Sequence, residues 1–287
     1  MEQTARTPYR IIGDSCCDYT TEPGALDFLT RVPLTIQVGE ETFVDDETLD
    51  CCGVLLDRMR ACPEAPHSAC PSPEQFAALC AEREGDVYIV TLSSHLSGTY
   101  NSACLGAQLA RDAGCGNRIH VFDSRSAAAG EIAVCLKLRT LAEQGLPFAQ
   151  VVEETEAFID GMTTLFVLET LDVFRKNGRL NHLQALAVGA LKIKLVMGGE
   201  QGQIAMRAKA LTTPRAIQKM IELVRQICET VHAAERTLVI THINCRTRAE
   251  DIRDRVLAAC PFQRAMVCEG GGISTMYGND GGIIVAF

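Results

Sequence analysis

Short apolar runs alternate with amphipathic stretches along the first half of the chain, and this alternation predicts the order of its elements. Residues 9–13, 87–90 and 119–122 are runs of the length and apolar character typical of buried strands. Apolar residues at helical spacing fall between and after these runs, predicting helices over 49–59, 73–84, 98–110, 127–143 and 148–159. Strands that alternate with helices favour a mainly parallel sheet with helices on both faces, so the fold class predicted is α/β.

Local signals add detail to this order. Ser72-Pro73-Glu74-Gln75 has a hydroxyl, a proline and a glutamine at the spacing of a capping box, which predicts a helix start. Residues 32–38 form a second extended run, and Gly39-Glu40-Glu41 is expected to turn it back toward 42–44.

The second half of the chain has a different pattern. A strand is predicted at 165–168, and the glycine-rich residues 198–202 indicate a hairpin tip between strands 194–197 and 203–207. Thr213-Pro214 predicts the start of a long helix with one apolar stripe, and Thr247 with Glu250 predicts another helix start after a strand at 237–241. With a final strand at 282–287, these elements predict a mixed α+β domain over 161–287, after an N-terminal α/β domain over 1–160.

Composition agrees with two ordinary domains. The chain has 287 residues, 47% of them hydrophobic and 22% charged, so intrinsic disorder is excluded. It has neither a run of 18 apolar residues nor an apolar leader, so we expect a cytoplasmic protein with at most transient membrane contact. The net charge of −9, without a Lys/Arg run, argues against nucleic acid as a partner.

Fourteen cysteines are many for a reduced compartment, but no C-x-x-C occurs among them. Cys16-Cys17 and Cys51-Cys52 are adjacent pairs, which rarely converge on one ion, and no HExxH or closely spaced histidines accompany them. We expect no metal site and interpret the cysteines as small buried residues. Of the six histidines, His242 follows a predicted strand and is interpreted as structural. The six are His67, His95, His120, His182, His232 and His242, and no two of them are four residues apart.

The most informative stretch follows the strand at 87–90 and opens the next helix, and it contains Ser97, Gly98 and Thr99. Free amides at a helix start favour an anionic group, and this loop would lie at the carboxyl ends of the strands, where ligands bind. The alternative is a hydroxyl-rich loop that only caps its helix. The stretch has neither a P-loop nor a dinucleotide-binding pattern.

Two acidic-hydroxyl pairs, Asp14-Ser15 and Asp123-Ser124, also follow strands. A phosphoaspartyl enzyme could begin with such an aspartate, but Cys16 stands where that chemistry commonly needs a second acid. We therefore interpret Asp14 and Asp123 as turn residues that accept backbone hydrogen bonds.

One basic cluster stands out in this acidic chain. Gly178 is expected to form a tight turn that exposes Arg175, Lys176 and Arg179 together. Such a cluster is either a solvated loop or a site for phosphate or an acidic partner.

Several ordered motifs resemble the DegV family of fatty-acid-binding proteins, over nearly the whole chain. Residues 14–18 match D-S-x-x-D, residues 93–103 match S-S-x-L-S-G-T-Y-x-S-A at every fixed position, and 123–127 match D-S-R-S-A. Residues 68–72 match T-S-Q-P-S with Ser68 for Thr and Cys70 for Gln. Thr170-Leu171 with Lys176-Asn177-Gly178-Arg179, and Ile193-Lys194, correspond to T-L-x-x-L-x-K-G-G-R and I-K-P.

The resemblance implies a non-enzymatic, two-domain protein without a cofactor that holds one long-chain fatty acid in a tunnel between or beside the domains. It would present the carboxylate to a partner fatty acid kinase, which forms an acyl-phosphate for phospholipid synthesis. The family's head-group hydroxyls correspond to Ser68 and Ser97, with Gly98 and Thr99 beside them. Asp14, Ser15, Asp123, Ser124 and the basic cluster are candidates for the pocket or for partner contact. Cys70 is the cysteine expected to lie near the ligand.

One departure and two alternatives accompany this interpretation. The family's C-terminal G-T-H-T-G-P-G is replaced by residues 274–282, where Met276 stands for the histidine, so that residue's role does not transfer. A lipid-responsive sensor would need the same pocket as a carrier. The other alternative is an enzyme acting on a small anionic substrate at Ser97 to Thr99.

Overall fold

The computed structural model describes residues 8–180 and 193–287. Its first sheet is parallel, with strand order β3-β1-β7-β8 (Leu29–Val32, Tyr9–Asp14, Asp86–Thr91 and Ile119–Asp123). The central strands β1 and β7 are buried along nearly their whole length. Their sequences are continuous apolar runs because helices cover both faces of a parallel sheet.

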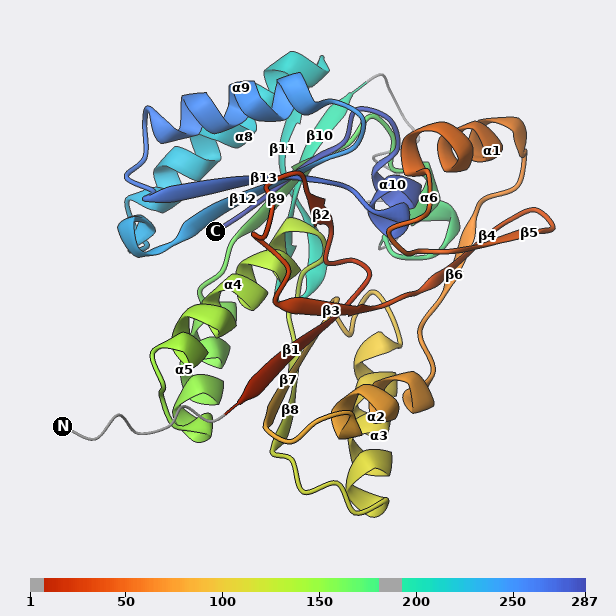
Figure 1. Cartoon of the computed structure of the whole chain (residues 1–287). Helices are drawn as coiled ribbons and strands as arrows, with labels where there is room; N and C mark the ends of the chain where they lie inside the picture. Colours follow the sequence, from red (N-terminus) through yellow and green to blue (C-terminus); the bar gives the residue numbers. More distant parts are fainter. Residues whose placement is uncertain (1–7, 181–192) are drawn as a thin grey trace.

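Two pairs of helices supply that cover (Figure 1). Helices α2 (Pro73–Ala81) and α3 (Thr99–Asp112) pack on the face that carries Ile12 and Ile89. Helices α4 (Ala129–Glu143) and α5 (Phe148–Asp160) pack on the opposite face. The predicted α/β class is confirmed, and the capping box at Ser72 forms as expected.

The second sheet is mixed, with strand order β11-β10-β9-β14-β12-β13-β2. Its strands are Gln203–Ala210, Lys194–Glu200, Thr164–Val167, Ile283–Ala286, Thr237–His242, Arg264–Glu269 and Tyr19–Thr20. Helices α8 (Thr213–Cys228) and α9 (Arg246–Leu257) cover one face, and the stripe predicted on α8 is buried there through Ile217, Met220 and Val224.

Helix α4 connects the two sheets. Its first turns place Ala129, Ile132 and Ala133 against the second sheet, whereas Val134 and Leu138 pack against the first. Strand β2, from the N-terminal half, also pairs with β13. Elements of the first half therefore take part in both sheets, and the domain boundary at residue 160 stays a prediction.

Smaller elements complete the fold. A short antiparallel sheet has the order β5-β4-β6 (Glu41–Val44, Thr35–Val38 and His67–Ala69). Around it and the second sheet lie η1 (Cys51–Leu55), α1 (Leu56–Ala61), α6 (Asp172–Lys176), η2 (Ala233–Glu235) and α10 (Gly272–Gly278).

Four local predictions are wrong in their bounds or their details, although the predicted hairpin between β10 and β11 does form. The run 32–38 divides into the end of β3 and β4, which belong to different sheets. The helix predicted over 49–59 begins as a π-helical turn at Cys51 and becomes α-helical only at Leu56. Residues 198–200 belong to β10, so the hairpin turn is Gln201-Gly202. Helix α9 begins at Arg246 without a side-chain cap, so Thr247 does not form the predicted box.

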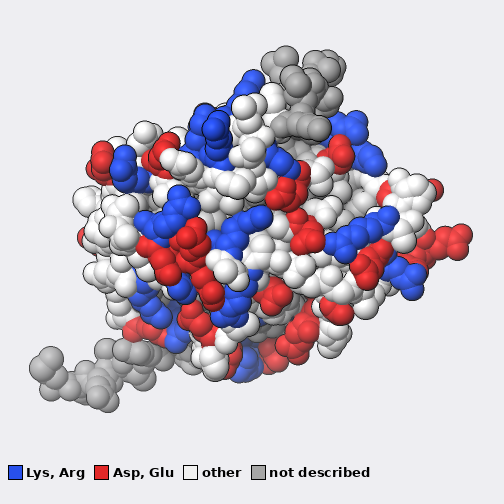
Figure 2. Space-filling model, turned by 90° about the horizontal axis from the view of Figure 1, so that it is seen from above, with Lys and Arg blue, Asp and Glu red and all other residues white. Residues whose placement is uncertain are grey.

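The surface is mixed in charge. Figure 2 shows acidic and basic side chains interspersed on the face seen from above. Within residues 8–180 and 193–287, no helix combines the length and the apolar character needed to cross a membrane.

Candidate functional site

A cavity lies where the two sheets and the small elements meet, and the empty space in it, with the open solvent at its mouth, is about 900 Å³. Its wall is mainly apolar and comes from both halves of the chain. The apolar side chains are Leu34, Leu92, Leu96, Ala127, Ala128, Phe166, Leu168, Phe174, Ile204, Ile273, Tyr277 and Ile284. A mainly apolar lining with a few polar groups is typical of sites that bind an apolar ligand and orient it.

Polar groups of the wall include the two serines predicted from the motifs. Ser68 lies on β6 and pairs with Ile36 of β4, and Ser97 lies in the loop before α3. Both side chains are half-buried. The tertiary structure therefore brings together two hydroxyls that are far apart in the sequence.

Gly98 and Thr99 support this wall without lining it. Gly98 is the N-cap residue of α3, and Thr99 is buried. The Thr99 amide, which the sequence suggested would be free, donates to Ser97 Oγ at 3.3 Å, and the two hydroxyl oxygens lie 2.9 Å apart. Ser97 thus accepts from the first backbone amide of α3 and also lines the cavity.

The basic cluster is not exposed together as predicted. Arg175 is exposed and pairs with Asp172 at 3.4 Å, and Lys176 is exposed beside it on α6. Arg179 is half-buried instead, lines the cavity, and donates to the backbone oxygens of Leu96 at 3.3 Å and Asn177 at 2.6 Å. The turn at Gly178, with φ of 71°, directs Arg179 away from α6 and toward the Ser97 loop.

The acidic-hydroxyl turns act as interpreted from the sequence. Asp14 accepts from the backbone N–H groups of Cys16 at 2.9 Å and Leu92 at 2.8 Å. Asp123 accepts from the amides of Ser94 and Arg125. These carboxylates shape the loops at the carboxyl ends of β1 and β8, and neither lines the cavity.

The hydroxyl partners of these aspartates are also structural. Ser15 Oγ accepts from the Leu34 amide at 3.0 Å, and Ser124 Oγ accepts from the Ser126 amide at 3.1 Å. Both side chains are fully buried. The two serines therefore fix loop geometry next to the cavity.

Two expectations about single residues are changed by the packing. Cys70 is exposed and does not line the cavity, whereas Cys16 is buried and does. Met276 is fully buried in an apolar cluster around α10, and its neighbours Ser274 and Tyr277 face the cavity instead. His182 lies outside the described residues.

Sequence reasoning missed Arg125 and Ala128, in the loop between β8 and α4, as part of the wall. Arg125 and Ala128 line the cavity and have positive φ values of 50° and 55°. Such conformations cost about 1–3 kcal/mol each and persist only where the surroundings impose them. Neither arginine nor alanine signals a positive φ, so the sequence pattern did not single out these two residues.

The two arginines of the wall, Arg125 and Arg179, have different hydrogen-bond partners. Arg125 pairs with Asp160 at 2.5 Å, whereas Arg179 donates to backbone oxygens within the part of the chain that the structure describes. No histidine of residues 8–180 and 193–287 hydrogen-bonds to Ser68 or Ser97. The arrangement can hold an apolar molecule with an anionic end near Ser68, Ser97 and Arg179.

Comparison with known proteins identifies what the chain resembles. The model of the DegV family, described as uncharacterised proteins, matches residues 8–286. A DegV domain-containing protein from Streptococcus pneumoniae is 32% identical over 283 residues, which cover 97% of this chain and 98% of that protein.

Solved structures agree over the whole length. A DegV family protein from Ruminococcus gnavus, refined with vaccenic acid, has a TM-score of 0.90 and 37% identity, covering 99% of this chain and all of its own. The Streptococcus pneumoniae Fatty Acid Kinase (Fak) B3 protein, loaded with linoleic acid, has a TM-score of 0.87 and 31% identity, covering 97% of this chain and 98% of its own.

Proposed function

The chain belongs to the DegV family, and we propose that it binds one long-chain fatty acid in the cavity between its sheets. The observation that carries this proposal is an apolar cavity whose few polar groups include two hydroxyls and an arginine, in a chain similar to structures that hold vaccenic and linoleic acid.

The energetics favour a ligand of this kind. Burial of about 15 methylene groups at roughly 0.8 kcal/mol each gives on the order of 10 kcal/mol. Hydrogen bonds to the head group add roughly 1–3 kcal/mol. The apolar wall therefore supplies most of the affinity, and the polar groups fix where the carboxylate lies.

We assign the carboxylate to the hydroxyls of Ser68 and Ser97, with Arg179 beside them. Arg179 supports this assignment because its contact with the Leu96 oxygen ties the cation to the Ser97 loop. Arg179 would add a charged hydrogen-bond donor to the two serine hydroxyls that meet the carboxylate.

The fatty acid is proposed as cargo for a partner kinase that converts the carboxylate to an acyl-phosphate for phospholipid synthesis. The similarity to the Fak B3 protein supports this role. The protein itself would do no chemistry, because neither serine hydroxyl has a histidine base within the described chain.

Two measurements test the proposal. Native mass spectrometry of protein purified from cells, followed by denaturation and lipid identification, should give a bound mass near that of a C16 to C18 acid. Reconstitution with a fatty acid kinase and ATP should then give acyl-phosphate. A protein that arrives empty and takes up no added fatty acid would refute the binding role, whereas binding without phosphorylation would refute only the carrier role.

A further inference from the structure

Some hydroxyls of the cavity wall are already used by the protein and others are not. The hydroxyls of Ser126 and Thr164 lie 2.7 Å apart, so each satisfies the other. The hydroxyls of Ser68 and Tyr277, both on half-buried side chains, have no hydrogen-bond partner within the part of the chain that the structure describes. A tyrosine hydroxyl at an apolar wall usually finds a polar partner. Ser68 is assigned to the head group above, which leaves the Tyr277 hydroxyl to be explained.

Helix α6 and the turn after it place Tyr277 beside the head-group residues. The ring of Phe174, on α6, lies 4.6 Å from the Tyr277 ring, and the Phe174 backbone oxygen accepts from the Arg179 amide at 2.9 Å. Asn177, in the same turn, donates at 2.9 Å to the backbone oxygen just before β6, the strand that carries Ser68. One short segment therefore connects Tyr277, the arginine and the first of the two serines.

Two buried carboxyl groups fix the helix that carries Tyr277. Asp18 accepts from the Gly271 amide at 2.9 Å, and Asp45 accepts from the Ile273 amide at 3.1 Å, both at the start of α10. The Tyr277 side chain thus projects from a helix that is anchored without a ligand. Such preorganisation lowers the entropy cost of a hydrogen bond to a ligand.

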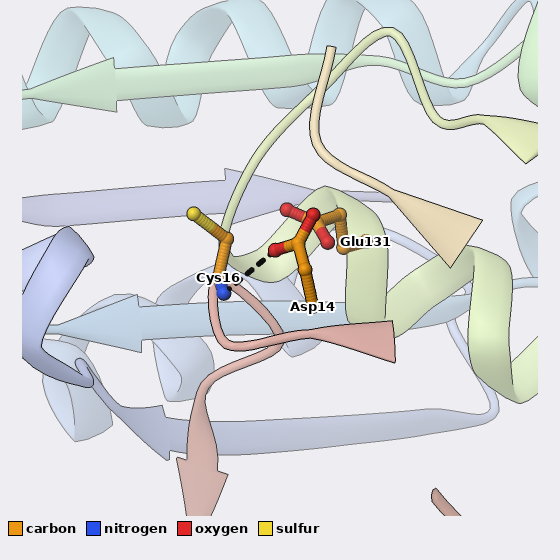
Figure 3. Close-up of side chains that lie close together, drawn as sticks. All are labelled: Asp14, Cys16 and Glu131. Atoms are coloured by element: carbon orange, nitrogen blue, oxygen red, sulfur yellow. Dashed lines mark hydrogen bonds between the residues drawn. The ribbon is translucent and has the colours of Figure 1, made fainter. Parts of the chain in front are cut away.

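Acidic groups lie behind another part of the wall. Asp14, Cys16 and Glu131 lie close together, and Figure 3 shows the carboxyl groups of Asp14 and Glu131 facing each other. Asp14 hydrogen-bonds with Glu131 and accepts from backbone amides, so these groups are used within the protein. Of the three residues, Cys16 lines the cavity. A ligand carboxylate next to Cys16 would be repelled, whereas the Arg179 guanidinium would attract it.

We propose that Tyr277 Oη donates a hydrogen bond to the carboxylate of the bound fatty acid, as a third hydroxyl beside Ser68 and Ser97. This inference rests on the proposed function. A carboxylate has about four lone-pair sites on its two oxygens, so it can accept from three hydroxyls and from Arg179 at once. Hydrogen bonds to an ionised acceptor are stronger than those to a neutral one, so these donors favour the free acid over its neutral esters.

Conservative variants test the proposal. Tyr277→Phe removes only the hydroxyl, and Tyr100→Phe makes the same change on α3, at a residue that does not line the cavity. Titration of delipidated protein with palmitic acid should show roughly tenfold weaker binding by Tyr277→Phe, the loss expected for one hydrogen bond to a charged group. Tyr100→Phe should stay within about twofold of the wild type. Methyl palmitate should lose less affinity than the acid, so the preference for acid over ester should fall in Tyr277→Phe alone.

The same titrations contain the results that would overturn the proposal. Equal affinities of Tyr277→Phe and the wild type for palmitic acid would show that the hydroxyl does not meet the carboxylate. Equal losses for the acid and the ester would place Tyr277 against the acyl tail instead. Binding by the wild type decides the proposed function separately: a wild type that binds neither compound would refute that function, and this inference with it.

Carbon-13 NMR of palmitic acid labelled at its carboxyl carbon reports the contact directly. The resonance of the bound acid should move between the wild type and Tyr277→Phe, because the carboxylate loses a donor, and should coincide for the wild type and Tyr100→Phe. An unchanged carboxyl resonance in Tyr277→Phe, or the same change in both variants, would contradict the proposal.

Discussion

Replacing Ser97 by alanine tests the head-group assignment most directly. The hydroxyl lies half-buried in the cavity wall and shares a hydrogen bond with the Thr99 hydroxyl at 2.9 Å. Loss of a hydrogen bond to a carboxylate costs roughly 1.5–2 kcal/mol at such a site, or roughly 10- to 30-fold in affinity. Since the apolar wall contributes on the order of 10 kcal/mol, the variant should still bind fatty acid.

Titration of delipidated protein with a fatty acid, by calorimetry or fluorescence displacement, measures this change. Ser94→Ala is the matched control: Ser94 is in the same loop, is exposed, and donates to Asp123 at 2.5 Å without lining the cavity. Its affinity should stay within twofold, or about 0.4 kcal/mol, of the wild type. The reasoning is refuted if Ser97→Ala binds as tightly as the wild type, or if both variants lose affinity equally. Unchanged acyl phosphorylation by the partner kinase would also count against it.

Three further predictions follow from the same structure. Ala127→Phe puts a ring into the cavity wall, where Ala127 is half-buried. Calorimetry should show much weaker binding of a C18 acid, while the thermal unfolding midpoint changes little. Unchanged binding would contradict the assignment of the fatty acid to this cavity. Arg179→Glu should weaken fatty acid binding in the same titration, because a glutamate carboxylate would then face the carboxylate of the ligand. Lys176→Glu, on the exposed face of α6, should leave binding unchanged. If the two variants bound equally, Arg179 would have no role in the cavity. Burial alone would raise the pKa of Glu169, but hydrogen bonds from Lys194 and Thr213 outweigh it and hold this pKa below its usual value. This stabilisation should be complete above about pH 4.5 and lost as the pH falls through the lowered pKa. The free energy of unfolding, measured with urea, should therefore fall less on acidification for Glu169→Gln than for the wild type. Parallel pH curves of the two proteins would show that the bonds of Glu169 to Lys194 and Thr213 contribute nothing to this dependence.

Local pattern determined most of the fold. Apolar runs such as β7 and the stripe on α8 are recognisable because their periodicity follows from burial on two faces or on one. The capping box at Ser72 depends on residues within one helical turn, so it too is legible in the sequence. The division of 32–38 between two sheets was not predictable, because the strand partners of β3 and β4 are distant in sequence.

For the site, the sequence determined which loops carry polar groups at strand ends, since turn chemistry is local. Only the tertiary structure decided which of them share a cavity: Ser68 and Ser97 meet there, and Cys16 faces it while Cys70 is exposed. It also decided that Arg179 lies at the cavity, apart from its exposed basic neighbours, and that Asp14, Cys16 and Glu131 lie close together. The physical reason is that such neighbourhoods depend on how β1, α4 and the loop before α3 pack, and packing joins residues whose separation along the chain carries no signal of contact.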